Sequence, residues 1–126
     1  MIQQQTILKV TDNSGAKTVK CVKVLNGFKR RFAILGDAII VSVQKLRNKA
    51  RLTSKVRKGE VHKAIIIRTK KRTVKKDGSL IFFRSNAVSL INQQGKPIAS
   101  RIIGPLPKVL KRRKKIKLVA LSSGFI

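Results

Sequence analysis

Two apolar, β-branched runs on either side of an Asp-Gly pair constrain the fold of this chain more than any other feature. Both runs lie within residues 60–92, and Asp77-Gly78 separates them. Because Asp-Gly accepts the positive φ angles of a tight turn, this stretch predicts a β-hairpin. Six cations and no acid lie between the first run and the turn: Arg68, Lys70, Lys71, Arg72, Lys75 and Lys76. A projecting hairpin with this charge indicates a polyanionic partner.

Further apolar runs between turn signals predict three more strands, over residues 6–10, 16–25 and 38–43. The β-branched content favours strands over a helical reading of the interleaved lysines. Alternation breaks at Cys21-Val22, which indicates a bulge or a strand buried on both faces. Five short strands predict a mainly β fold, a small closed or partly closed barrel that leaves no exposed edge.

The remaining segments are predicted to be a loop and a helical tail. Residues 45–58 are rich in Lys and Arg and poor in apolar residues, so we expect a loop whose charge serves a ligand. Gly104 to Pro107 breaks any strand, and Pro107 suits the first turn of a helix. We therefore expect one domain over residues 1–126, with a β-barrel over about 1–103 and one or two short helices over about 104–126.

The charge balance limits the function classes. The chain has 31 Lys and Arg against 4 Asp and Glu, a formal net charge of +27, yet 42% of its residues are hydrophobic. Such a chain has material for a core and attracts polyanions at long range, which favours a folded nucleic-acid-binding protein. A DNA-architectural protein and a membrane-active basic protein stay as alternatives, although no run of about 20 apolar residues exists to span a bilayer.

The chain offers little material for catalysis or for a metal site. Each of the four acids (Asp12, Asp37, Glu60 and Asp77) lies in a turn or at the start of a strand, which leaves no carboxylate pair for acid–base work. His62 is the only histidine and is read as a solvated or core-edge residue. Cys21 is the only cysteine and is expected to be buried. We expect neither an enzyme nor a cofactor.

Phe28 and Phe32 bracket three consecutive cations, Lys29, Arg30 and Arg31. Both rings are expected to be core residues at the end of a strand, whereas the cations are expected to contact RNA. The alternative is that the rings stack on unpaired bases.

The central hairpin resembles the signature of the universal large-subunit ribosomal protein fourteen (L-fourteen) family. The matching residues are Ala64 to Ile67, Asp77-Gly78, Phe83 and Asn86, followed by Ser89-Leu90, where the family usually has an aliphatic residue first. The likeness covers nearly the whole chain, with near-identical segments at residues 12–16, 21–25, 36–37, 58–59 and 101–105.

The resemblance implies a five-stranded β-barrel with small C-terminal helices, on the face of the large subunit that meets the small one. It implies binding to large-subunit rRNA, bridges to small-subunit rRNA, and a neighbouring large-subunit protein, number nineteen in bacterial-type ribosomes. Residues 45–49 correspond to one bridge region. Ser100-Arg101 and the C-terminal helices correspond to a surface for subunit joining and for a silencing or anti-association factor.

Charge and family match together predict the site residues. The predicted RNA-binding residues are Lys17, Lys23, Lys29, Arg30, Arg31, Lys45, Arg47, Lys49, Lys58, Arg68, Lys70, Lys71 and Arg101. The predicted intersubunit or factor-docking residues are Ser100, Arg101, Lys111, Arg112, Lys114 and Lys115. The basic run at 111–115 is read as a charged face against rRNA, with a nuclear address as the alternative.

The N-terminal residues lack the features of a secretory signal or a transit peptide, so we expect the chain to start near residue 1 and to act where it is made, in a reducing compartment. Its charge exceeds that of ordinary bacterial members, and its composition leans towards Ile, Lys and Asn. These features predict an organelle-encoded protein of the mitochondrial matrix, with a plastid or an AT-rich bacterium as alternatives.

Overall fold

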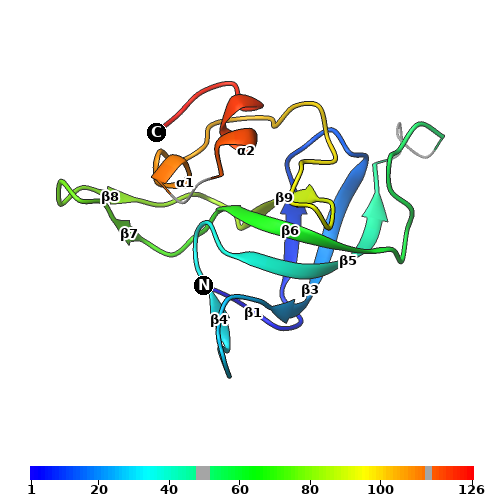
Figure 1. Cartoon of the computed structure of the whole chain (residues 1–126), viewed down its shortest axis with the longest axis horizontal. Helices are drawn as coiled ribbons and strands as arrows, with labels where there is room; N and C mark the ends of the chain where they lie inside the picture. The colour runs from blue at the N-terminus through cyan, green and yellow to red at the C-terminus, as the bar shows by residue number, and fades with distance from the viewer. Residues whose placement is uncertain (48–51, 113–114) are drawn as a thin grey trace.

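A closed five-stranded β-barrel forms the body of the molecule (Figure 1). The structure is a computed structural model that describes residues 1–47, 52–112 and 115–126. The barrel order is β2-β3-β5-β6-β9, closed by a parallel pairing of β2 with β9, and the other four pairings are antiparallel. The strands are β2 (Ile7–Val10), β3 (Ala16–Val24), β5 (Ala38–Leu46), β6 (Val61–Arg68) and β9 (Ala87–Ile91). The predicted fold class is confirmed.

Smaller elements decorate the barrel. Strand β1 (Ile2–Gln3) pairs with β4 (Phe32–Ala33), and β7 (Thr73–Val74) pairs with β8 (Leu80–Ile81). The β7–β8 pair is the tip of an arm that extends from β6 and β9, and the helices α1 (Val109–Arg112) and α2 (Ile116–Ala120) lie above its root in Figure 1. The Leu110 N–H donates to the Pro107 carbonyl, so Pro107 lies in the turn that leads into α1.

Strand β3 contains the bulge that the broken alternation predicted. Its pairing with β5 runs from Cys21↔Val41 to Lys23↔Ile40, so Val22 is the extra residue. The bulge keeps Cys21 buried while Val22 and Lys23 face solvent. Burial raises the pKa of the Cys21 thiol, which keeps it protonated and unreactive.

Strands β6 and β9 are buried on both faces. Ala64 and Ile66 face the barrel interior, where they join a cluster with Val88 and Leu90. The alternate residues, including Ile65 and Ile67, pack in a second cluster with Leu106, Leu110 and Leu118 of the C-terminal segment. The uninterrupted apolar runs of the hairpin therefore reflect two cores, one inside the barrel and one beneath the helices.

A buried carboxylate fixes the turn between β2 and β3. Asp12 Oδ1 accepts from the Ser14 N–H at 3.1 Å and from the Ser14 hydroxyl, which confirms the predicted turn chemistry. Its Oδ2 accepts from the Leu90 N–H at 2.8 Å and from the Ser89 hydroxyl at 3.2 Å. Ser89, which departs from the usual aliphatic residue, is thus a buried donor to Asp12 and satisfies that buried charge.

The predicted loop over residues 45–58 is wrong at its start. Strand β5 continues to Leu46, so Lys45 is a strand residue paired with Thr18. The strand extends because β3 runs alongside it as far as Ala16, which pairs with Leu46. Further along, Val56 is buried in the barrel core.

Candidate nucleic-acid interface

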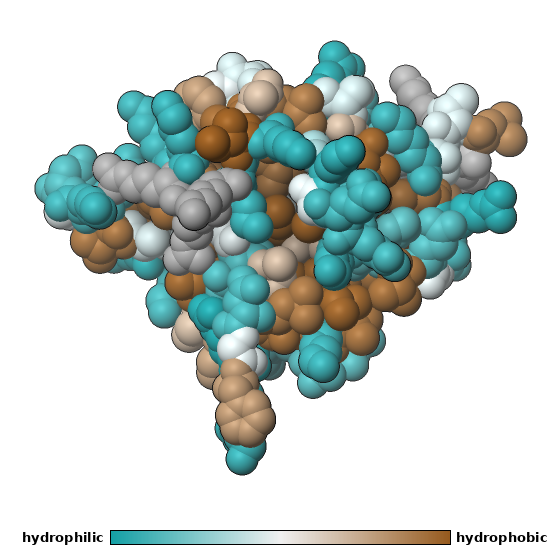
Figure 2. Space-filling view, in the orientation of Figure 1, coloured by the Kyte–Doolittle hydropathy of each residue, from teal (hydrophilic) through white to brown (hydrophobic). Residues whose placement is uncertain are grey.

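The four acids are all engaged within the chain, and with 31 Lys and Arg against 4 Asp and Glu most of the cations have no acid to pair with. Asp12 and Asp37 are buried, Glu60 accepts from the Arg57 N–H and contacts His62 at 2.9 Å, and Asp77 accepts from Ser79. Arg30 forms an ion pair with Asp37, and the His62 ring lies 2.9 Å from a Glu60 carboxylate oxygen. Figure 2 shows hydrophilic side chains spread over the visible face of the barrel and the arm.

The hydrogen bonds to the two exposed acids also set their pKa values. Backbone donation by Arg57, followed by the contact with His62, lowers the pKa of Glu60. Donation by the hydroxyl and then by the N–H of Ser79 lowers the pKa of Asp77. Both carboxylates therefore stay ionised and serve local structure.

The Arg30 side chain bridges the two ends of the loop between β3 and β4. The Arg30 guanidinium donates to the carbonyls of Asn26 and Phe32, each at 3.0 Å, and contacts Asp37 Oδ2 at 2.8 Å. Asn26 and Lys29 both have positive φ angles, 68° and 51°. Arg30 was predicted to contact RNA, but its side chain is occupied by loop carbonyls and a buried carboxylate, so its first role is structural.

The expectation that Phe28 and Phe32 are core rings is wrong. Phe28 is 92% exposed and Phe32 is 43% exposed. The clamp by Arg30 turns the chain outward between them, and Figures 1 and 2 show this loop, ahead of β4, standing clear of the body. Lys29 Nζ lies 5.4 Å from the Phe28 ring centroid, which places a cation against an exposed aromatic ring.

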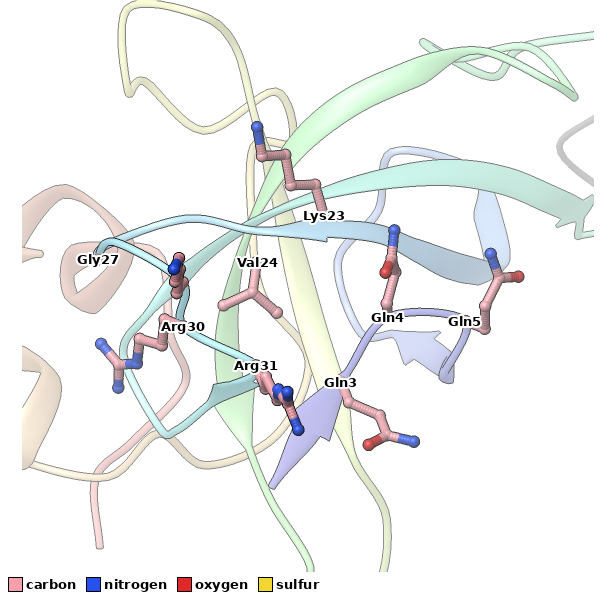
Figure 3. Close-up of a pocket in the computed structure, with 9 residues that line it drawn as sticks. Gln3, Gln4, Gln5, Lys23, Val24, Gly27, Arg30 and Arg31 are labelled. Carbon is pink, nitrogen blue, oxygen red and sulfur yellow. The ribbon is translucent and has the colours of Figure 1, made fainter.

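An open pocket lies beside this loop. Figure 3 shows its lining, which comes from β1 and the turn after it, from the end of β3, and from the β3–β4 loop. Its volume is about 620 Å³. The lining residues are Gln3, Gln4, Gln5, Lys23, Val24, Gly27, Lys29, Arg30 and Arg31, and no acid is among them in the described part of the chain. Three predicted RNA contacts, Lys23, Lys29 and Arg31, are thereby brought together with exposed side chains.

The arm carries a second group of predicted contacts. Lys70 and Lys71 are exposed, and the Lys70 N–H donates to Asn86 Oδ1 at 2.9 Å, which fixes the backbone where the arm leaves the barrel. Arg72 lies 5.7 Å from the ring of Phe82, and both side chains are exposed. The arm therefore presents a row of solvated cations interleaved with apolar side chains.

Arg68 has a different position from its neighbours. Its guanidinium is partly buried and donates to the carbonyls of Ile103 and Pro105, which lie between the barrel and α1. Burial lowers the pKa of Arg68. Since its bonds join β6 to the C-terminal segment, this predicted RNA contact is first a structural tether.

The predicted docking residues Ser100 and Arg101 lie beside the Asp12–Ser14 turn. Asn13 Oδ1 accepts from the N–H groups of Ser100 and Arg101, and its amide donates to the Ser100 hydroxyl at 2.7 Å. Both side chains remain exposed. The backbone of this surface is therefore fixed while the Arg101 guanidinium faces solvent.

The other predicted residues are dispersed. Lys17, Lys45, Lys58 and Lys111 are exposed, and Lys115 is half-buried ahead of α2. The half-buried Arg47 donates to the Val10 carbonyl at 3.0 Å. Lys49, Lys114 and the side chain of Arg112 lie outside the described residues.

Sequence reasoning missed the glutamines. Gln3, Gln4 and Gln5 line the pocket, and Gln5 has a φ of 72°, in the left-handed region that such residues rarely adopt. The sequence did offer one signal: three consecutive glutamines, whose amides can hydrogen-bond to bases, in a chain whose charge already indicated a nucleic-acid partner.

The described residues contain no group of three or more His, Cys, Asp or Glu that could hold a metal ion. Within the same residues, no helix is long and apolar enough to cross a membrane.

A comparison with protein families identifies one match over the full chain. The model of the family described as ribosomal protein L14p/L23e matches residues 1–126. The resemblance drawn from the hairpin signature and the spaced segments is confirmed.

Proposed function

The chain belongs to the ribosomal protein L14p/L23e family, and we propose that it binds large-subunit rRNA and helps to form bridges to the small subunit. Membership makes it a non-enzymatic structural protein of the large ribosomal subunit, with rRNA and ribosomal proteins as its partners. The observation that carries the proposal is a net charge of +27 on a rigid barrel whose acids are all engaged internally.

The mechanism is neutralisation of phosphates by cations held on a fixed frame. Folded RNA is recognised largely through its shape, phosphates and 2′-hydroxyl groups, which suits an array of exposed Lys and Arg. Each contact with a phosphate releases condensed counterions and contributes about −0.7 to −0.9 to the salt slope. Contacts by about ten cations give a slope of roughly −7 to −9.

Sedimentation of the full-length protein with ribosomal subunits tests the proposal. We expect it in the large-subunit peak of a sucrose gradient after a high-salt wash. Filter binding should show a steep salt dependence and a preference for structured rRNA over duplex DNA. Equal affinity for DNA would favour an architectural DNA-binding protein, and co-sedimentation with lipid vesicles would favour a membrane-active one.

The bridge role rests on the exposed cations around Arg101 and Lys111, together with the region near Lys45. Arg101→Glu is expected to leave incorporation into the large subunit intact and to weaken association with the small subunit. Lys96→Glu is the charge-matched control, because Lys96 is an exposed lysine in the turn after β9. If both variants associate normally, the bridge role is wrong.

Two finer assignments belong with this proposal. Large-subunit protein nineteen is the expected neighbour in a bacterial-type ribosome, and a silencing or anti-association factor is expected to dock over Ser100 and Arg101. Cross-linking within purified large subunits tests the neighbour, and loss of factor binding in Arg101→Glu tests the docking surface.

The mitochondrial matrix remains a prediction from charge and composition, which a nuclear or bacterial coding sequence would contradict.

A further inference from the structure

The pocket beside the β3–β4 loop combines three kinds of group that recognise unpaired nucleotides. It has side-chain amides from Gln3, Gln4 and Gln5 and exposed cations, and the exposed ring of Phe28 belongs to the residue between Gly27 and Lys29, both of which line the pocket. We propose that this pocket binds a short unpaired stretch of rRNA, with bases of that stretch against the glutamine amides and another stacked on Phe28. The inference rests on the proposed rRNA binding and names the part of the RNA that this site takes.

In Figure 3 the Gln3 side chain points away from those of Gln4 and Gln5, so the three amides can contact successive bases of one strand and not a single base. Within the described residues, none of the three glutamine side chains donates or accepts a hydrogen bond, although the backbone around them is fixed. The Gln5 N–H donates to the Cys21 carbonyl at 2.7 Å, which ties the turn after β1 to β3. A carboxamide has both donors and an acceptor, so it can pair with the Watson–Crick or Hoogsteen edge of an exposed base.

The pocket is also of suitable size and charge. Its volume of about 620 Å³ lies within the roughly 300–1,000 Å³ of small-ligand sites. Lys23, Lys29 and Arg31 are exposed cations on its lining, so the phosphates on either side of a bound base would find counter-charge. Val24, the last residue of β3, adds an apolar side chain to this otherwise polar lining (Figure 3).

The exposed ring of Phe28 lies on a loop whose backbone is held by hydrogen bonds from Arg30. The three contacts of the Arg30 guanidinium hold the loop that carries Phe28, so little loop entropy is lost when a base stacks on it. Lys29 lies over the ring at 5.4 Å, and the ring remains 92% exposed, which leaves area for a base. The alternative partner is an acidic protein surface. It would pair with the cations but would leave the three glutamine amides and the Phe28 ring without a role.

Chemical probing of the rRNA tests the site. Dimethyl sulfate and a carbodiimide modify the Watson–Crick edges of unpaired bases, and the full-length protein should protect at least one of them. In the double variant Gln3→Ala/Gln4→Ala this protection should be lost while other footprints persist. The matched control is Gln93→Ala/Gln94→Ala, because these two exposed glutamines lie in the turn after β9, outside the pocket.

The aromatic contact has its own pair of variants. Phe28→Leu should weaken rRNA binding about 5- to 150-fold with an unchanged salt slope, because stacking is lost and no phosphate contact is. Phe28→Tyr should restore the affinity, and Phe82→Leu, which alters an exposed ring on the arm, should retain the footprint beside the pocket. All of these side chains are exposed, and thermal unfolding verifies that the variants fold.

The outcomes separate this inference from the proposed function. If the unaltered protein fails to bind rRNA, the proposed function fails and the site with it. If rRNA binding is normal but the Gln3/Gln4 variant protects the same bases as its control, the pocket inference alone is overturned. Loss of vesicle binding in Phe28→Leu without a change in rRNA binding would overturn it in favour of a membrane.

Discussion

Arg30 and Arg68 hold the two projections of this molecule in place, and they do so in different ways. Arg30 clamps the β3–β4 loop through two carbonyls and a buried carboxylate, Asp37. Arg68 ties β6, where the arm begins, to the C-terminal segment through two carbonyls and no carboxylate. Next to each clamp lie exposed cations, Arg31 and Lys70. Neighbouring cations in one basic run thus differ in role: those that bond to nearby carbonyls stabilise the fold, and those whose side chains are exposed remain available to a partner.

Arg68→Met should produce the larger loss of stability. It removes a charged, partly buried donor from two carbonyls, so we expect a loss of about 2–3 kcal/mol in the free energy of unfolding. Urea denaturation measures this loss. Lys70→Met, two residues away and exposed, is the control and should stay within about 0.5 kcal/mol of the unaltered protein. Equal effects of the two changes would contradict the tether.

Gly104→Ala tests the contact between Arg68 and the C-terminal segment from the other side. Gly104 has a φ of 84°, and an added Cβ would lie 2.5 Å from an Arg68 guanidinium nitrogen. We expect a loss of about 1–3 kcal/mol from backbone strain and from displacement of the guanidinium. In the Arg68→Met background the cost should fall, because only the backbone strain remains. Purely additive losses in a double-mutant cycle would exclude direct contact between the two residues.

Arg30→Met should cost about 1–2 kcal/mol, because the Arg30 side chain is 33% exposed and solvent screens part of its ion pair. Arg31→Met should leave stability unchanged within about 0.5 kcal/mol but reduce the salt slope of rRNA binding by about 0.7. Thermal unfolding and filter binding of both variants measure the two effects. A salt slope that responds to Arg30 more than to Arg31 would reverse our assignment.

The sequence predicted the architecture well because periodicity and turn chemistry act locally. Asp77-Gly78, the break at Cys21-Val22 and the β-branched runs each correspond to an observed turn, bulge or strand. The site was predicted less well, because a lysine or arginine looks the same in the sequence whether its partner is a phosphate or a distant carbonyl. Arg68 bonds to residues more than thirty positions away, a contact that only the closed barrel and its second core bring about.

The smallest expected effect is the pH dependence of stability that comes from Glu60 and Asp77, the acids at the two ends of the basic hairpin. Glu60 precedes β6 and Asp77 lies at the arm tip, and hydrogen bonds lower the pKa of Glu60 below its ordinary value of 4.5 and the pKa of Asp77 below its ordinary value of 3.8. A lowered folded-state pKa contributes stability that is present above the unfolded-state value and is lost as the pH falls through the folded-state value. Stability should therefore decline slightly on acidification below about pH 4.

Asp77→Asn isolates the contribution of the arm tip, because the amide oxygen can still accept from the Ser79 N–H. We expect the variant to be slightly less stable than the unaltered protein at pH 7, and this difference should shrink as the pH is lowered through the folded-state pKa of Asp77. Urea denaturation at several pH values measures the difference, and a carboxyl NMR titration locates the pKa. An Asp77 that titrates at its ordinary value would mean that the Ser79 hydrogen bonds do not persist in solution. The arm tip would then lack the kind of fixed contacts that Arg30 and Arg68 provide where the two projections leave the barrel.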